Sequence, residues 1–323
     1  MLSRVADSIY WMNRYVERAE NIARFLDVTQ AMALDMPPTS MPPWGALVSA
    51  SGDQEYFDQK YGEATRENVV QFLTFDAEYA GSIISSVTAA RENARSVREV
   101  ISSEMWEQLN QFYISVRDAA SAGPLESTTN FFQYVKNASH LFVGISVTTF
   151  SQGEPWHFAR LGRVLERADK TSRILDVKYF VLLPNVEDVG TPIDDLQWSA
   201  VLRSVSGFEM YRKRHHGITP KRVVGFLVLD RLFPRAIMHC VNVADRSLHA
   251  ISGSPEGTFW NVAEKQLGQL RSELAYMTVD EIINTGLHEF LDSLQVKLNR
   301  VGEGIFQSFV AIAPDESSLT TTP

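Results

Sequence analysis

RYVERAENIARFLDV at residues 14–28 is nearly repeated as RVLERADKTSRILDV at residues 163–177. This repeat decides the fold. Aligning residues 9–28 with 158–177 gives eight identities in twenty positions, and the charges agree better than the apolar residues. The identical pairs are Arg14/Arg163, Glu17/Glu166, Arg18/Arg167, Ala19/Ala168, Arg24/Arg173, Leu26/Leu175, Asp27/Asp176 and Val28/Val177. Such self-similarity predicts a chain built from two related halves.

A second correspondence follows at nearly the same offset. VVQFLTFD at residues 69–76 matches VVGFLVLD at residues 223–230 in five positions, the last of which is an aspartate. Both halves therefore share the order long helix, short helix ending at aspartate, long helix. We interpret this order as a tandem duplication, with a first half at 1–150 and a second half at 151–313. The halves are predicted to pack into one helical body with approximate two-fold pseudo-symmetry, followed by a disordered tail at 314–323.

The spacing of apolar residues predicts helices along the chain. Between Leu2 and Leu26 these residues recur at alternating steps of three and four, which is one face of an amphipathic helix. Four prolines at 35–45 must end that helix, which we expect to reach about Leu34. No segment shows the sustained two-residue alternation of β-strands. The chain is therefore predicted to be an all-α multi-helix bundle.

Further helices are expected in both halves. The segment at 128–150 is apolar on several sides, which predicts a helix near the centre of the fold rather than at its surface. The other predicted helices cover residues 66–119, with an interruption near 75–82, and residues 151–183, 194–216, 220–229, 234–250, 257–276 and 279–312.

Composition limits the class of protein. The chain has 323 residues and a net charge of -9, and no apolar run is long enough to span a bilayer. The acidic balance argues against a nucleic-acid partner, since a phosphate backbone normally requires a basic surface. The N-terminal stretch enters a helical pattern without the apolar core of a secretory signal, and the one cysteine, Cys240, fits a reducing compartment. We therefore expect a cytoplasmic protein with neither nucleic-acid nor membrane partners.

A polar stripe runs along each copy of the repeated helix, separated from its apolar face. At about 100° per residue, it consists of Tyr10, Arg14, Glu17, Asn21 and Arg24 in the first copy and of Arg163, Glu166, Lys170 and Arg173 in the second. Three interpretations are open: a solvated face with intrahelical ion pairs, a buried Arg–Glu network that fixes helix register, or a site for an anion or carboxylate. The charges persist while neighbouring residues differ, which is unexpected for a face that merely contacts water.

AARENARSVREV at residues 89–100 adds a second group of charges. Arg91, Arg95 and Arg98 are predicted to share one helix face, and Glu92 is spaced for pairing with Arg95. Arginines placed in this way either meet the acids of the repeated helices or hold a carboxylate or phosphate through paired N–H donors. Both alternatives stay open at this point.

Familiar catalytic and cofactor signatures are absent from the sequence. It contains no GxxxxGK[ST] loop, no GxGxxG after a strand and no HExxH. The seven histidines are scattered, and the adjacent His215 and His216 point in different directions on a helix, so no metal site is expected. Cys240 lies in an apolar helix and is expected to be a core residue. We therefore expect no cofactor and favour a protein that is not an enzyme.

Four motifs in order resemble the bacterial alpha-E family, an all-helical family with repeated Glu/Arg motifs. The motifs are YWMNRYVERAENIARFLDV (10–28), ARENARSVREVISSEMWEQLN (90–110), LGRVLERADKTSRILDVKY (161–179) and FLVLDRLFPRAI (226–237). The resemblance covers almost the whole chain. By association, the resemblance implies six candidate functional positions: Glu17, Arg24, Glu92, Arg95, Glu166 and Arg173. This chain departs from the family in DAEYAGSI (76–83), where the family more often has Asn-Pro in place of Tyr79-Ala80.

The resemblance also implies a functional context. Genes of the family typically accompany circularly permuted ATP-grasp proteins and transglutaminase-like peptidases, which suggests a system that makes or modifies peptide amide bonds. We expect a non-catalytic helical partner that binds the ATP-grasp ligase or its peptide substrate. The alternative is an enzyme that uses the Glu/Arg clusters for acid–base or carboxylate chemistry during amide formation or transfer.

Overall fold

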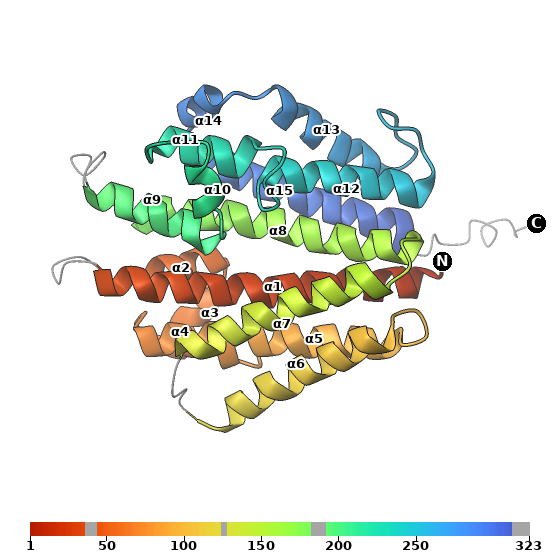
Figure 1. Ribbon diagram of the computed structural model, residues 1–323, viewed down its shortest axis with the longest axis horizontal. Coiled ribbons are helices and arrows are strands. Elements are labelled where there is room, and N and C mark those ends of the chain that lie inside the picture. The colour runs from red at the N-terminus through yellow and green to blue at the C-terminus, as the bar shows by residue number, and fades with distance from the viewer. Residues whose placement is uncertain (36–43, 124–127, 182–191, 312–323) are drawn as a thin grey trace, which may run out of the picture.

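The described part of the chain is built from helices (Figure 1). The computed structural model describes residues 1–35, 44–123, 128–181 and 192–311, and within these ranges it contains no strand. The all-α prediction is therefore confirmed. Most of the proline-rich loop, the predicted helix end beyond Val181 and the tail at 314–323 lie outside the described residues. No helix in the described ranges has the length and hydropathy needed to cross a membrane.

Two long helices form the centre of the molecule. α1 (Ser3–Asp35) and α8 (Glu154–Val181) carry the two copies of the repeated sequence and lie side by side (Figure 1). α1 ends within one residue of the predicted position. Both helices bury side chains around most of their circumference, because their apolar residues contact the surrounding helices and their polar stripes face each other.

Each central helix is covered by a layer of its own. α1 packs against α5 (Ile83–Ser96) and α7 (Thr128–Thr149), and α6 (Ser103–Ser121) joins these two. α8 packs against α12 (Ile237–Ser252) and α15 (Leu287–Ile305), and α13 (Val262–Tyr276) joins these two. Cys240 is fully buried in α12, where burial raises the pKa of its thiol to about 12, as expected for a core residue.

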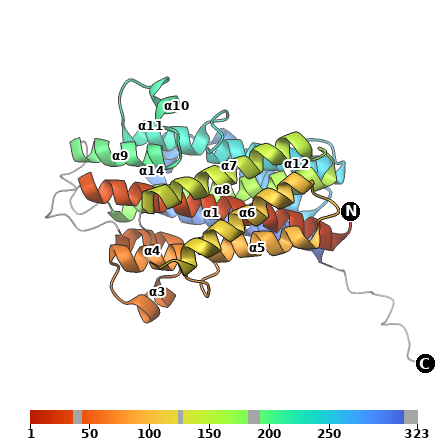
Figure 2. The same cartoon turned by 60° about the horizontal axis from the view of Figure 1, so that its bottom comes forward.

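Short helices cross between the two layers. α2 (Trp44–Ser51) packs on α8, and α9 (Pro192–Ser204) packs on α1. Figure 2 shows α3 and α4 on one side of the central pair and α10 and α11 on the other. The remaining bounds are α3 (Gln54–Tyr61), α4 (Arg66–Phe75), α10 (Phe208–Arg212), α11 (Pro220–Val224), η2 (Gly225–Leu229), α14 (Val279–Thr285) and η3 (Phe306–Val310). The sequence pattern did not predict α2 and α3, because eight residues hold too few turns to show a helical period.

Two predicted helices are interrupted. The expected helix at 194–216 ends at Ser204, and the chain turns at Ser206 before α10 begins. Ser206 has a φ of 50°, in the left-handed region that a helix cannot continue through. The expected helix at 279–312 is divided at Gly286, whose φ of 97° is open to glycine because it has no Cβ.

The prediction that the helix at 128–150 lies near the centre is wrong. α7 contacts α1 and α6 on one side, and its other side is open to solvent. Tyr134, Leu141 and Val147 are exposed there, with Leu141 54% exposed. The apolar content of α7 is therefore greater than its packing in this chain requires.

The turn after α4 and the turn before α12 have the same local structure. Asp76 accepts the backbone N–H of Tyr79 at 3.3 Å, and Asp230 accepts that of Phe233 at 2.7 Å. Each aspartate also pairs with a cation that precedes it by the same number of residues: Lys60 at 2.9 Å from Asp76, and Arg214 in contact with Asp230. The Tyr79-Ala80 departure from the family pattern therefore leaves the first turn in the same conformation as the second.

Candidate functional site

The polar stripes of α1 and α8 meet in the middle of the molecule and form one buried network. At its centre lie the carboxylates of Glu17 and Glu166, which are 1% and 0% exposed. This burial excludes a solvated polar face. Ions removed from water in this way need partners of opposite charge, because desolvation costs several kcal/mol per unpaired ion.

The centre of the network is a reciprocal exchange between two Glu-Arg dipeptides. Arg18 of α1 donates from Nε and Nη2 to the two carboxylate oxygens of Glu166, at 2.7 and 3.1 Å. Arg167 of α8 donates in the same way to Glu17, at 2.9 and 2.7 Å. Arg14 adds a further contact to Glu166 at 2.8 Å. Two-point contacts fix the orientation of both groups, so the exchange sets the register of α1 against α8.

A third element reaches into the network from the turn before α12. Arg235 donates to Glu17 at 3.2 Å, to Asn21 at 2.9 Å and to Glu20 at 2.5 Å. Arg24 donates to the same Glu20 oxygen at 2.8 Å. The acids of α1 are thus held by cations from three different segments of the chain.

Two arginines extend the network to the short crossing helices. Arg173 donates to Asp169 at 3.0 Å and to the carbonyl oxygen of Ala50, near the end of α2, at 3.0 Å. Arg24 donates to the carbonyl oxygen of Ser204, at the end of α9, at 3.3 Å. The last carbonyls of a helix have no partner within the helix, and a guanidinium there also interacts favourably with the helix dipole. These contacts tie each crossing helix to the central pair.

The arginines keep the central acids ionised. Burial by itself would raise the pKa of Glu17, but the guanidinium groups of Arg167 and Arg235 hold this pKa below its ordinary value. Burial acts in the same direction on Glu166, and Arg18 is the first of the cations that bring its pKa well below the ordinary value. Neither acid exchanges a proton near neutral pH, so neither is suited to general acid–base catalysis.

Arg163 occupies the position in α8 that Arg14 occupies in α1. Unlike Arg14, it forms no ion pair within the described residues. Burial, followed by the nearby charge of Arg167, lowers the pKa of Arg163 to about 10. Arg163 therefore adds positive charge to the centre without a carboxylate of its own.

The arginines of α5 lie apart from the network. Arg91 and Arg95 each contact Glu92 at 2.7 Å, and the side chain of Arg95 is 65% exposed. α5 ends at Ser96, before Arg98. The guanidinium groups of Arg98 and Arg91 nevertheless lie over the same ring, at 4.8 and 5.6 Å from the ring centre of Trp106. α5 turns its apolar residues toward α1, so its charges point away from the central acids.

The structure brings in residues that the sequence pattern did not single out as candidates. These are Arg18, Glu20, His140, Arg167, Asp169 and Arg235. Arg18 and Arg167 were visible as identities within the repeat, and that signal would have found them. Arg235 is 218 residues from Glu17 in the sequence, and no helical spacing connects the two.

The network has more cations than acids. Within the described residues it contains eight cations, Arg14, Arg18, Arg24, Arg163, Arg167, Lys170, Arg173 and Arg235, and four acids, Glu17, Glu20, Glu166 and Asp169. The chain as a whole has a net charge of -9. A local excess of positive charge in partly buried surroundings attracts anions.

The fold and the reciprocal pairs define a class of all-helical protein organised around paired Glu-Arg dipeptides. Residues 1–310 match the Alpha-E family, described as a predicted alpha-helical domain with a conserved ER motif. The chain belongs to this family. Its sequence contains the dipeptide Glu-Arg twice, at Glu17-Arg18 and Glu166-Arg167, and these are the dipeptides that exchange partners between α1 and α8.

Curated relatives are longer proteins. An uncharacterised protein of Mycobacterium bovis is 31% identical over 117 residues, which are 32% of this chain and 13% of that protein. Two uncharacterised proteins of Mycobacterium tuberculosis match over the same length at 31% and 30% identity, with the same coverage. The matched part of the chain thus spans 13% of the length of these relatives. No solved structure matches the chain.

Acid is expected to destabilise the fold through the central carboxylates. Because the pKa values of Glu17, Glu20 and Glu166 are lowered in the folded state, their stabilisation is complete above the unfolded value of about 4.5. It is lost as the pH falls below that value towards the folded pKa. Burial raises the pKa of Asp176 and Asp245. Their protonation therefore favours the folded state as the pH falls, which opposes the effect of the central glutamates.

Urea unfolding at about pH 6 and about pH 3 measures this effect. The free energy of unfolding should be lower at the acid pH by at least about 2 kcal/mol. Equal values at the two pH values would contradict the ionised state of the central acids. A Glu166→Gln variant serves as the control, because it should lose less stability over the same interval.

Proposed function

We propose that the chain is a non-catalytic helical partner in an ATP-grasp-dependent system that makes or modifies peptide amide bonds. In this role it binds the ligase or the peptide substrate in the cytoplasm, and a transglutaminase-like peptidase acts in the same system. The functional context comes from the family resemblance, and three observations support the assignment to a partner rather than to an enzyme.

The state of the central acids is the first support. Each central glutamate receives a two-point contact from an arginine of the other long helix, and its pKa is lowered. A catalytic acid or base instead needs a pKa near the working pH and access to substrate. The arrangement stabilises the packing of α1 on α8.

The exposed side of α7 is the strongest support for the proposal. Three large apolar side chains, those of Tyr134, Leu141 and Val147, are exposed on this one helix. Tyr134 and Leu141 are seven residues apart and therefore lie on one face of the helix. Exposed apolar residues on a shared face favour a protein interface, because a partner would remove them from water. We assign the outer face of α7 as the docking surface for the ligase.

The length of the curated relatives is the third support. In the mycobacterial relatives the matched region is 13% of a much longer chain. A helical region joined to further sequence in one polypeptide fits a protein that works together with another one.

We also infer that the two halves arose by tandem duplication and are related by approximate two-fold symmetry. The matching aspartate turns support this inference, as do the reciprocal contacts of Arg18 with Glu166 and of Arg167 with Glu17. In a two-fold arrangement, a contact from residue i to residue j is accompanied by one from j to i.

Co-purification tests the proposed partner. The tagged chain is co-expressed with the ATP-grasp protein of the same host and isolated with and without ATP. Stoichiometric recovery of the ATP-grasp protein is expected, and Leu141→Glu should reduce that recovery by about tenfold, because it places a charge in the apolar surface. Leu232→Glu is the matched control: Leu232 is 73% exposed in the turn before α12, and its replacement should leave recovery unchanged.

The enzymatic alternative has a separate outcome. If the chain alone forms or transfers amide bonds between added peptides, the assignment as a non-catalytic partner is wrong. Recovery of no partner in either nucleotide condition, with the wild-type chain well folded, would equally contradict the proposal.

A further inference from the structure

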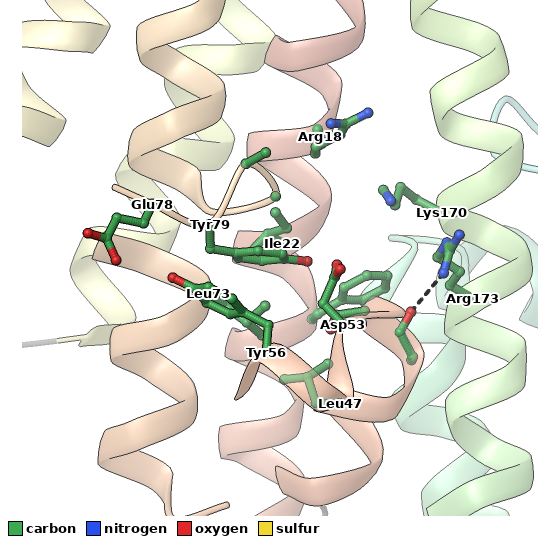
Figure 3. A pocket seen from close by; sticks show the side chains of 15 residues that line it. Arg18, Ile22, Leu47, Asp53, Tyr56, Leu73, Glu78, Tyr79, Lys170 and Arg173 are labelled. Atoms are coloured by element: carbon green, nitrogen blue, oxygen red, sulfur yellow. Dashed lines mark hydrogen bonds between the residues drawn. The ribbon is translucent and has the colours of Figure 1, made fainter. Parts of the chain in front are cut away.

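A pocket of about 400 Å³ lies between α1, α2 and α8, beside the turn that joins α4 to α5 (Figure 3). Its lining contains three cationic side chains, Arg18 from α1 and Lys170 and Arg173 from α8. Figure 3 shows these on one side of the pocket and the rings of Tyr56 and Tyr79 on the other. The pocket therefore combines a cationic end with a largely apolar body.

The second half has a smaller pocket, of about 320 Å³, at the corresponding place, and Arg235 is part of its lining. Gly81 lies five residues after Asp76, and Arg235 lies five residues after Asp230, in turns of the same structure. Arg235 reaches Glu17 and occupies that side of the network. Gly81 has no side chain, and the ring of Tyr79 takes the space where one would begin, since a Cβ at Gly81 would lie 2.4 Å from that ring. The pocket lies beside these two residues.

Lys170 supplies the charge that is missing at Gly81. It occupies the position in α8 that Asn21 occupies in α1, and Asn21 is one of the groups that Arg235 contacts. The ammonium group of Lys170 lies 3.1 Å from Asp169 and 3.7 Å from Glu166. The replacement of Asn by Lys and of Arg by Gly thus preserves the positive charge of the site.

The cations of the pocket retain capacity for an additional anion. The side chains of Arg18, Lys170 and Arg173 are 15–21% exposed, so part of each reaches the pocket. An ammonium has three N–H donors and a guanidinium has five, more than their contacts within the protein use. At this end of the network four cations, Arg14, Arg18, Lys170 and Arg173, share two buried acids, Glu166 and Asp169.

The other residues that line the pocket determine which chemical group the bound molecule carries besides its anionic group. Ile22, Leu47 and Leu73 line the pocket together with the tyrosine rings, and they favour an uncharged, apolar body. Asp53 and Glu78 also line the pocket and disfavour a second negative charge on the occupant. The occupant that fits is small and has a single anionic group.

We propose that this pocket binds a small organic anion. Its carboxylate or phosphate contacts Arg18, Lys170 and Arg173, and its apolar group lies along Ile22 and Leu73. This site is separate from the outer face of α7, so it does not depend on the proposed ligase partner.

Calorimetric titration of the full chain tests the site with four probes. Hexanoate and phenyl phosphate each combine an anionic group with an apolar group, inorganic phosphate has only the charge, and hexanamide has only the apolar group. Saturable binding of hexanoate or phenyl phosphate at one site is expected, and the tighter of the two identifies the anionic group. Equal affinity for hexanamide, equal affinity for inorganic phosphate, or no binding of either organic anion overturns the proposal.

Two variants locate the binding. Lys170→Asn introduces the residue found at the corresponding position of α1 and should weaken binding about tenfold or more, whereas Lys213→Asn makes the same change at an exposed site and should have no effect. Because Lys170 also contacts Asp169 and Glu166, Ala80→Trp provides an independent test that leaves the ion pairs in place. Ala80 is exposed and lines the pocket, and a tryptophan there should block it. Unchanged binding in both variants would place the ligand elsewhere and overturn the proposal.

Discussion

Replacing Glu166 by lysine is expected to lower the free energy of unfolding by about 3–5 kcal/mol, the range found when a buried ion pair loses one partner. Glu166 is completely buried and accepts hydrogen bonds from Arg14 and Arg18. The substitution leaves both guanidinium groups without their carboxylate and adds a third cation beside them. The stability of most domains is only about 5–15 kcal/mol, so this single change removes a large part of it.

Urea unfolding of the wild type and of two variants measures the effect. Glu107→Lys makes the same change of charge on the exposed side of α6, where we expect a shift within about 0.5 kcal/mol. Glu166→Gln retains the size of the side chain and should fall between the two. A Glu166→Lys variant as stable as the Glu107→Lys variant would show that the central ion pairs do not hold α1 against α8.

Gly162→Ala is expected to destabilise the fold by about 3 kcal/mol, at the upper end of the usual cost of overpacking. A Cβ atom at Gly162 would lie 2.3 Å from the backbone oxygen of Tyr10 and 3.1 Å from its carbonyl carbon. The obstacle is backbone, which cannot rotate away as a side chain can. To accept one methyl group, α8 must therefore move away from α1, and the reciprocal Glu-Arg contacts must lengthen.

Gly144→Ala is the matched control for this prediction. Gly144 is exposed in the interior of α7, and a Cβ atom there would meet no atom within 4 Å. Alanine is a better helix former than glycine by about 0.8–1 kcal/mol, so this variant should be more stable than the wild type. Thermal unfolding of both variants provides the comparison. If the two variants changed stability in the same direction, close approach of α1 and α8 at Gly162 would not be the cause.

Much of the secondary structure could be predicted because it depends on local order in the sequence. The apolar period from Leu2 to Leu26 predicted α1, and the repeat predicted a second helix of the same kind at α8. α2 and α3, each of eight residues, escaped prediction, as did the breaks at Ser206 and Gly286. A single residue with positive φ ends a helix without disturbing the apolar period on either side.

The candidate site was predicted in part. Glu17, Glu166, Arg24 and Arg173 do belong to one polar centre, and the retained charges of the repeat were the signal for it. Arg95, in contrast, has the same favourable helical spacing and lies at the surface. Helical spacing shows which residues share a face but not what that face contacts.

The sequence by itself determined the all-helical class, the position of most helices and the presence of two similar charged stripes. Each of these depends on residues three or four apart, so each is encoded locally. Only the tertiary structure decided that the stripes face each other, that Arg18 pairs with Glu166 rather than within its own helix, and that α7 lies at the surface. It also decided that Arg235 enters one side of the network and that a pocket lined by Arg18, Lys170 and Arg173 lies at the other. These outcomes depend on how close two helices approach and in which register they pack, and no interval along the chain specifies either.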